Sequence, residues 1–298
     1  MNARAALFDL FGDHLRSRGG RASVAALVRL LAPLGITAPA VRTAISRMVR
    51  QGWLRPEKLP QGPGYAVTPK AVRRLDEAAA RVYRAGAITW SGRWHLVVME
   101  PVRERARRER IRAELAFLGY APLSESTWIG PRPAPELDAL LTGERVRADR
   151  FDARLEDDPR ELVARAWDLP AIGAAYERWL DQAVELVGSL PEEAAALCAA
   201  HAAGRAGRAG REDDTADDTA DDAHAGDERR QELESQVFAV RSRLVHGWRN
   251  FLFRDPGLPA ELLPPGWPGD KARAYFEQEA ARLLPAAAAF VDRCLAGG

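Results

Sequence analysis

Residues 38–51 have two sharply different faces when they are drawn as a helix. The i, i+3, i+4, i+7 positions of an inward-packing stripe are occupied by Val41, Ala44, Ile45 and Met48. The other side carries only basic and hydroxyl side chains, with no acid: Arg42, Thr43, Ser46, Arg47 and Arg50. We predict an amphipathic helix capped by Thr37 and closed by Gly52, whose outer face is suited to a polyanion.

Two predicted helices precede this segment, and two predicted strands follow it. Apolar residues at helical spacing indicate a helix over 3–18, and Ser23 is suited to cap a second, shorter one. Residues 53–55 and 65–67 have the composition of short strands, joined by the turn-rich stretch 60–64. Three helices followed by a β-hairpin is the element order of a winged helix-turn-helix domain.

The predicted hairpin adds two cations, Arg55 and Lys58, which would contact the DNA backbone. In the major groove, arginine can bond bidentately to guanine, while serine and threonine reach phosphates or bases. The candidate DNA-binding residues are therefore Arg42, Thr43, Ser46, Arg47, Arg50, Arg55 and Lys58. The alternative is a winged helix used only for protein contacts, which an acid-free outer face disfavours.

The charge of the chain is unevenly distributed. Residues 1–70 hold eleven basic and three acidic side chains, a net charge of +8, whereas the whole chain of 298 residues carries +1. A basic unit on a nearly neutral chain indicates that this unit meets a polyanion such as double-stranded DNA. The alternative is a basic surface that is merely solvated.

The composition predicts a soluble protein of the cytoplasm. The hydrophobic fraction of 47% and the charged fraction of 29% are typical of globular proteins, and no apolar run is long enough for a membrane span. Asp9 and Asp13 interrupt the N-terminal apolar pattern, which argues against a signal peptide. Cys198 and Cys294, a lone distant pair, are expected to be reduced thiols.

The middle of the chain alternates predicted strands and helices. Strands are expected over 94–99, 126–129 and 146–155, separated by helices over 104–118 and 135–141. This order suggests a small α/β unit of ferredoxin-like type.

From residue 159 onward the pattern is helical. One predicted helix spans about 227–253, and a last one spans about 271–295 with an interruption at Pro285. Before the first of these helices lies a low-complexity acidic run with almost no apolar residues, which we expect to be disordered.

The predicted fold class is thus α+β, in three consecutive domains. A winged helix-turn-helix domain with a connecting helix is expected over 1–86, a ferredoxin-like α/β domain over 87–158, and an all-helical C-terminal domain over 159–298 with the disordered acidic insertion at about 204–228.

Several long blocks of the sequence resemble a known family. They are GDHLRSRGG, AVRTAISRMVRQGWL and LVHGWRNFLFRDPGLPAELLPPGWPG, with similar stretches in LAFLGYAPLSESTWIGP and LVARAWDLPAI. Together they resemble the PaaX family of bacterial phenylacetate-degradation repressors over nearly the whole chain. The acidic run departs from the family pattern as an insertion between helices.

The resemblance implies a repressor of phenylacetate catabolic genes that binds a DNA operator as a homodimer and needs no cofactor. It also implies an effector, phenylacetyl-coenzyme A (phenylacetyl-CoA), whose binding releases the DNA. A coenzyme A thioester needs cations for its phosphates and an apolar slot for its aromatic end. Residues of these types are Trp128, Trp248, Arg249 and Arg254. The alternative is that Trp248 belongs to the core and that the arginines bind helix carbonyls.

Two other functions remain open. A ferredoxin-like domain also resembles that of CRISPR-associated metal-dependent nucleases, which carry an aspartate where this chain has Glu100. The five histidines are scattered, and the G-x-S-x-G, P-loop and H-E-x-x-H motifs are absent, so we expect no enzyme and no metal. The second alternative is a PaaX-like regulator of another pathway with a different ligand.

Overall fold

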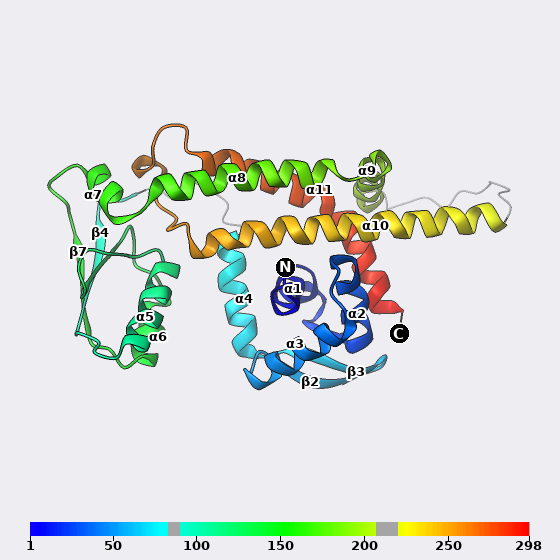
Figure 1. Ribbon diagram of the computed structural model, residues 1–298, viewed down its shortest axis with the longest axis horizontal. Helices are drawn as coiled ribbons and strands as arrows, with labels where there is room; N and C mark the ends of the chain where they lie inside the picture. The colour runs from blue at the N-terminus through cyan, green and yellow to red at the C-terminus, as the bar shows by residue number, and fades with distance from the viewer. Residues whose placement is uncertain (83–89, 207–219, 298) are drawn as a thin grey trace. The chain divides into compact units, whose positions relative to one another are not determined.

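The computed structural model describes residues 1–82, 90–206 and 220–297 (Figure 1). They form two compact units, each built from separate stretches of the chain. The first unit comprises Met1–Tyr83, Leu180–Trp248 and Arg273–Gly298, and the second comprises Arg84–Trp179 and Arg249–Ala272. The expected three domains were consecutive segments, whereas here the helical segment 159–298 contributes to both units. The three-domain boundaries therefore stay a prediction.

The first unit begins with a run of short helices. They are α1 (Ala3–Leu10), the π-helix η1 (Phe11–Leu15), the 3-10 helices η2 (Arg16–Arg18) and η3 (Ala32–Leu34), α2 (Val24–Leu31) and α3 (Ala38–Arg50). Ser23 caps α2 as predicted, because its hydroxyl accepts a hydrogen bond from the amide of Ala26 at 3.1 Å. Thr37 occupies the N-cap position of α3, but its side chain makes no capping bond, so that part of the prediction is wrong.

Helix α3 buries the predicted stripe. Val41, Ala44, Ile45 and Met48 are each at most 5% exposed, and the helix packs against α1 and α2. The chain leaves the helix at Gly52, whose φ of 70° lies in the left-handed region that glycine adopts without strain. The apolar spacing that predicted this helix therefore also predicted which face is buried.

The strands after α3 are longer than the sequence indicated. β2 (Leu54–Leu59) and β3 (Gly62–Val67) pair from Leu54–Val67 to Leu59–Gly62, so the connecting turn is only two residues. The expectation that 60–64 is all turn was wrong. A short strand that the sequence did not predict, β1 (Arg21–Ser23), pairs with β3 and completes an antiparallel sheet of order β1-β3-β2.

Gly64 explains the misleading turn signal. A Cβ at this position would lie 2.7 Å from the carbonyl oxygen of Ala22 and 2.5 Å from Leu59 Cδ1. Glycine is therefore needed inside β3 because β1 approaches closely, not because the chain turns there.

The remainder of the first unit is helical, with α4 (Pro69–Val82), α9 (Glu192–Ala206) and parts of three long helices. These are α8 (Leu169–Gly188), α10 (Ala220–Arg249) and α11 (Pro268–Ala296), which the division into units cuts. Cys198 and Cys294 are both buried and unpaired. None of the helices in the described ranges has the length and apolar character of a membrane span.

Pro285 does not interrupt the last helix, contrary to expectation: α11 runs through it. A proline removes one helical hydrogen bond and disturbs the preceding turn. One turn before the proline, the carbonyl of Ala280 accepts a hydrogen bond from Arg241 Nε at 3.0 Å, which ties this part of α11 to α10.

The prediction of a disordered insertion at 204–228 is wrong at its two ends. Residues 204–206 belong to α9 and 220–228 to α10, while 207–219 lie outside the described residues. Side-chain contacts within and beside α10 support its first turns: Gln231 binds Asp227 at 2.6 Å, and Arg229 binds Glu193 at 2.8 Å.

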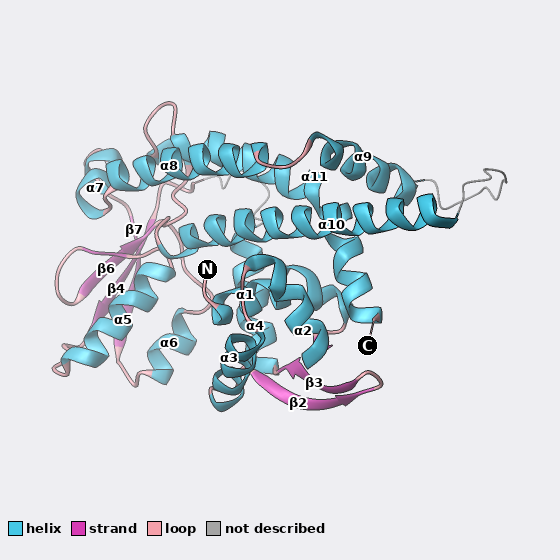
Figure 2. Cartoon of the chain, turned by 45° about the vertical axis from the view of Figure 1, so that its right-hand side comes forward, coloured by secondary structure: helices cyan, strands magenta, loops and turns pink. Residues whose placement is uncertain are grey.

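The second unit contains a four-stranded antiparallel sheet of order β5-β6-β4-β7. Its elements run β4 (Trp94–Met99), α5 (Arg105–Phe117), β5 (Ala121–Pro122), β6 (Thr127–Gly130), α6 (Leu137–Gly143) and β7 (Ala148–Ala153). Helices α5 and α6 cover one face of the sheet (Figure 2). The core between them contains Val97, Met99, Ile111, Leu115, Tyr120, Trp128, Leu137 and Leu141.

The C-terminal part of the second unit holds α7 (Pro159–Ala166) and the 3-10 helices η4 (Asn250–Phe253) and η5 (Ala260–Leu262). Tyr176 stacks on Phe251 with ring centroids 3.9 Å apart and meets the edge of Trp267 at 6.1 Å. Its hydroxyl also bonds to Asp255. The long GWRNFLFRDPGLPAELLPPGWPG block is thus folded back onto α8 through aromatic contacts within this unit.

Candidate nucleic-acid interface

The outer face of α3 is open to solvent. Arg42, Thr43, Ser46, Arg47 and Arg50 are all exposed, and the structure brings them together on one side of the helix. None of the three arginines forms an ion pair with another residue in the part of the chain that the structure describes. Their guanidinium groups are therefore available to an external anion, and no carboxylate on the helix would repel a phosphate.

The hairpin β2–β3 lies beside α3 (Figure 2). Its two predicted cations differ in their exposure to neighbouring acids. Lys58 is exposed opposite Pro63 and has no acidic partner among the described residues. Arg55 is exposed too, but it pairs with Glu57 at 2.8 Å, and Arg21 pairs with the same carboxylate at 3.2 Å. Of the two hairpin cations, Lys58 is thus the one whose charge is not partly neutralised by a neighbouring carboxylate.

Two cations near this surface escaped the prediction. Arg21 lies on β1, and it was missed because the three-residue strand gives no alternating pattern. Lys70 lies in the first turn of α4, with its ammonium group 4.5 Å from the centre of the Trp53 ring. Its position in the sequence, directly after the predicted hairpin, could have indicated that Lys70 lies near this surface.

Buried polar contacts hold the helices that carry this surface. Asp13 of η1 forms an ion pair with Arg241 of α10, and the side chains are 9% and 3% exposed. His14 Nε2 lies 3.3 Å from the same guanidinium. Burial lowers the pKa of His14 to about 4, although neighbouring Asp13 opposes the shift. The imidazole is therefore neutral at pH 7.

Three more contacts join the N-terminal helices to the C-terminal part of the first unit. They link Asp9 to His246 at 2.7 Å, Arg18 to Asp292 at 2.6 Å, and Arg29 to the carbonyl of Cys294 at 2.7 Å. The basic N-terminal segment is thus fixed on α10 and α11 by side chains far away in the sequence.

The four candidate effector residues are divided between the two units. Trp128 lies in the sheet core of the second unit, 3% exposed, and its indole N–H has no hydrogen-bond partner among the described residues. Trp248 is 6% exposed in the first unit, stacked on Phe276 with centroids 4.7 Å apart. In the second unit, Arg249 is half-buried and Arg254 is exposed.

The carboxylate that a nuclease would need is not in a metal site. Glu100 is exposed and lies 3.8 Å from Arg147. In the ranges that the structure describes, no three His, Cys, Asp or Glu side chains are arranged to hold a metal ion.

Family comparisons match the chain in three successive segments. The models are "PaaX-like protein" over residues 2–71, "PaaX protein central Cas2-like domain" over 87–163 and "PaaX-like protein C-terminal domain" over 217–293. The chain belongs to the PaaX family. The first match contains α3 and the hairpin, and the third contains Arg241 and its turn of α10.

Comparisons with individual proteins agree with this family assignment. The "Transcriptional repressor PaaX" of Escherichia coli (strain K12) is 28% identical over 292 residues, which cover 95% of this chain and 81% of that protein. Among solved structures, the "Uncharacterized protein Rv0674 from Mycobacterium tuberculosis" is similar with a TM-score of 0.55, 22% identity and 98% of both chains covered. This second likeness concerns the fold alone.

Proposed function

We propose that this PaaX-family chain is a transcriptional repressor that binds double-stranded DNA through α3. The observation that carries the proposal is the exposed, acid-free face of Arg42, Thr43, Ser46, Arg47 and Arg50 above a fully buried apolar stripe. A helix of this kind fits the major groove, and the hairpin β2–β3 would lie along the backbone as a wing. The repressor named among its relatives supports this assignment.

The architecture supports the same proposal. Helices α1 to α3 followed by β2–β3 have the order of a winged helix-turn-helix domain. The central sheet has the βαββαβ order and the antiparallel strand order expected of a ferredoxin-like domain. One reading helix per chain specifies too few base pairs for a genomic site, so we expect a homodimer on a two-fold symmetric operator. Such a protein would act in the cytoplasm.

Selection of bound sequences from a random duplex library, with the full chain, tests DNA recognition. We expect a two-fold symmetric consensus and a complex of two chains per duplex by light scattering. Loss of affinity in Arg47→Ala would place the reading surface on α3. Recovery of no preferred sequence, or a single chain per duplex, would contradict the proposal.

We further propose that the repressed genes serve phenylacetate catabolism and that an aryl-acetyl-CoA, such as phenylacetyl-CoA, releases the DNA. The support is the family membership and the cations Arg249 and Arg254, which suit phosphates. A releasing ligand must bind the DNA-free conformation more tightly than the DNA-bound one. Titration of the complex with phenylacetyl-CoA, coenzyme A and phenylacetate tests this. Release by phenylacetate alone, or by none of the three, would indicate a regulator of another pathway.

A further inference from the structure

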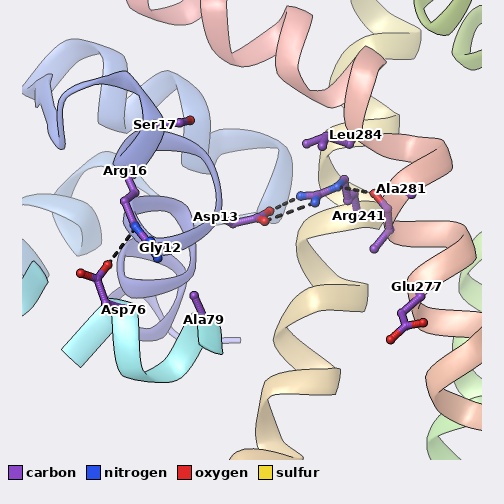
Figure 3. A pocket seen from close by; sticks show the side chains of 11 residues that line it. Gly12, Asp13, Arg16, Ser17, Asp76, Ala79, Arg241, Glu277, Ala281 and Leu284 are labelled. Atoms are coloured by element: carbon purple, nitrogen blue, oxygen red, sulfur yellow. Dashed lines mark hydrogen bonds and ion pairs between the residues drawn. The ribbon is translucent and has the colours of Figure 1, made fainter. Parts of the chain in front are cut away.

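A cleft of about 860 Å³ lies within the first unit, between the N-terminal segment and the helices α10 and α11 (Figure 3). The N-terminal segment forms one side of it, with Gly12, Asp13, Arg16 and Ser17 after α1 and with Asp76 and Ala79 on α4. The other side belongs to the scaffold, with Arg241 on α10 and Glu277, Ala280, Ala281 and Leu284 on α11. A molecule in this cleft would touch both parts at once.

The backbone at the cleft is unusual on its N-terminal side. Residues Phe11–Leu15 form a π-helix, and two of them, Gly12 and Asp13, line the cleft. A π-turn inserts one extra residue into a helix and occurs frequently at functional sites. The cleft thus borders the π-helix η1, which directly follows α1. Helix α3 packs against α1.

The α11 wall has an apolar stretch with a charge at one end. Glu277, Ala280, Ala281 and Leu284 follow the i, i+3, i+4, i+7 spacing of one helix face. At a rise of 1.5 Å per residue, about 10 Å of helix separates the Glu277 level from the Leu284 level. This wall suits an elongated molecule with one charged end and an apolar body.

The charges around the cleft select the sign of that molecule. Asp13, Asp76 and Glu277 supply three carboxylates against two guanidinium groups. Both guanidinium groups are already used, since Arg241 pairs with Asp13 and Arg16 pairs with Asp76 at 2.9 Å. Glu277 is exposed and forms no ion pair with any residue in the described ranges. The excess charge is negative, which disfavours the phosphates of a coenzyme A.

We propose that this cleft binds an organic cation with an elongated apolar body, with its ammonium group at Glu277 and its body along Ala281 and Leu284. The occupant would be a second effector, separate from an acyl-CoA. Because it touches both η1 and α11, it shifts the affinity for DNA whenever the two DNA-binding states hold these walls differently. The shift in DNA affinity rests on the proposed DNA binding, whereas the binding of the cation does not.

Three probes of equal length and different charge test the site itself: 4-phenylbutylamine, 4-phenylbutanamide and 4-phenylbutanoate. In calorimetric titrations of the full chain, we expect the amine to bind at least tenfold more tightly than the carboxylate, with the amide between them. Binding of the amine should weaken as salt rises, because the rim is solvent-exposed. Equal affinities for amine and carboxylate, or no binding of the amine at millimolar concentration, would overturn the proposal.

Variants locate the probe. Glu277→Gln should weaken binding of the amine by a factor of about two to five and leave binding of the amide unchanged, as an ion pair at a solvent-exposed rim predicts. Glu185→Gln, at another exposed acid on α8 outside the cleft, is the matched control and should change neither. Ala281→Phe fills the cleft from an exposed position and should abolish binding of all three probes. If Glu277→Gln and the parent chain bound the amine with the same affinity, the proposed position of the ammonium group at Glu277 would be wrong.

The regulatory consequence is measured separately, on a duplex recovered from the sequence selection. Saturating 4-phenylbutylamine should change the DNA affinity by at least fivefold, the lower end of ordinary allosteric coupling. Ala281→Phe should remove this response. If the probe bound without any change in DNA affinity, the coupling would be refuted and the binding site would stand. If the protein bound no DNA at all, the proposed function would be refuted instead.

Discussion

The carboxylate of Asp13 and the guanidinium of Arg241 form a buried ion pair across 228 residues of sequence. Asp13 lies in the π-helix that follows α1, and Arg241 lies in α10. Arg241 also donates to the carbonyl of Ala280 in α11, so a single guanidinium connects three helices. This contact fixes the segment that carries the proposed reading helix onto the scaffold of the first unit.

Removing one partner of this pair should cost much more stability than removing an exposed one. Asp13→Asn leaves the Arg241 charge buried without its counter-ion, and we expect a loss of about 3–5 kcal/mol in the free energy of unfolding by urea denaturation. Asp292→Asn breaks the Arg18 pair, in which Asp292 is 61% exposed, and should cost less than about 1 kcal/mol. Similar small losses in both variants would show that the buried pair does not hold the helices.

The sequence could not have predicted this pair. Asp9 and Asp13 stood out only as interruptions of an N-terminal apolar pattern, and their partners His246 and Arg241 lie in a helix of mixed composition. Helical periodicity reports which face of a segment is buried, and it does so correctly for α3. It carries no information about which distant side chain meets a buried charge, because that depends on how the helices assemble.

His14 should make stability depend on pH in the mildly acidic range. Its pKa is lowered to about 4 by burial, below the 6.5 of the unfolded chain, so the unfolded state binds the proton first. The stabilising contribution is complete above pH 6.5 and is lost as the pH falls towards 4. Between pH 7 and pH 5 the loss should be about 2 kcal/mol.

The comparison with His14→Gln isolates this contribution. The variant has no titrating ring at the site, so its unfolding free energy should fall less over the same interval, by the amount assigned to His14. Denaturant titrations at half-unit pH steps measure both profiles. Parallel profiles for the two chains would show that His14 is not buried in its neutral form.

Gly64→Ala should destabilise the small sheet. The added Cβ would meet the carbonyl oxygen of Ala22 at 2.7 Å, and backbone cannot move aside as a side chain can. We expect a loss of about 1–3 kcal/mol in unfolding free energy, typical of overpacking. Gly226→Ala is the control: the position is helical and open, so the variant should be neutral or stabilised by up to about 1 kcal/mol. Equal effects of the two substitutions would contradict the close approach of β1 to β3.

At Gly64, at Pro285 and in residues 220–228 of the acidic run, the local sequence signal predicted a structure that the protein does not adopt. Each residue type has a strong intrinsic preference, for a turn, a helix break or disorder. In the structure, Gly64 serves a close strand contact, and Arg241 binds the carbonyl of Ala280 in the turn before Pro285. Residues 220–228 are helical at the start of α10, where acids are favoured by the helix dipole. A tertiary contact explains Gly64 and the helix dipole explains the acidic residues, whereas the described contacts do not account for the continuation of α11 through Pro285.

The proposed DNA surface predicts distinct phenotypes for its cations. Arg47→Ala, on the face of α3, should cost about 1–3 kcal/mol of binding and relax the preference at one position per half-site. Lys58→Ala should weaken all sequences alike and reduce the slope of log affinity against log salt by about one unit, because an unshared charge on the wing meets the backbone. Arg55→Ala should have a smaller effect than Lys58→Ala, since Glu57 already neutralises part of the Arg55 charge. Fluorescence anisotropy at four salt concentrations separates these outcomes. An unchanged operator affinity in both Arg47→Ala and Lys58→Ala would show that the DNA lies on another face.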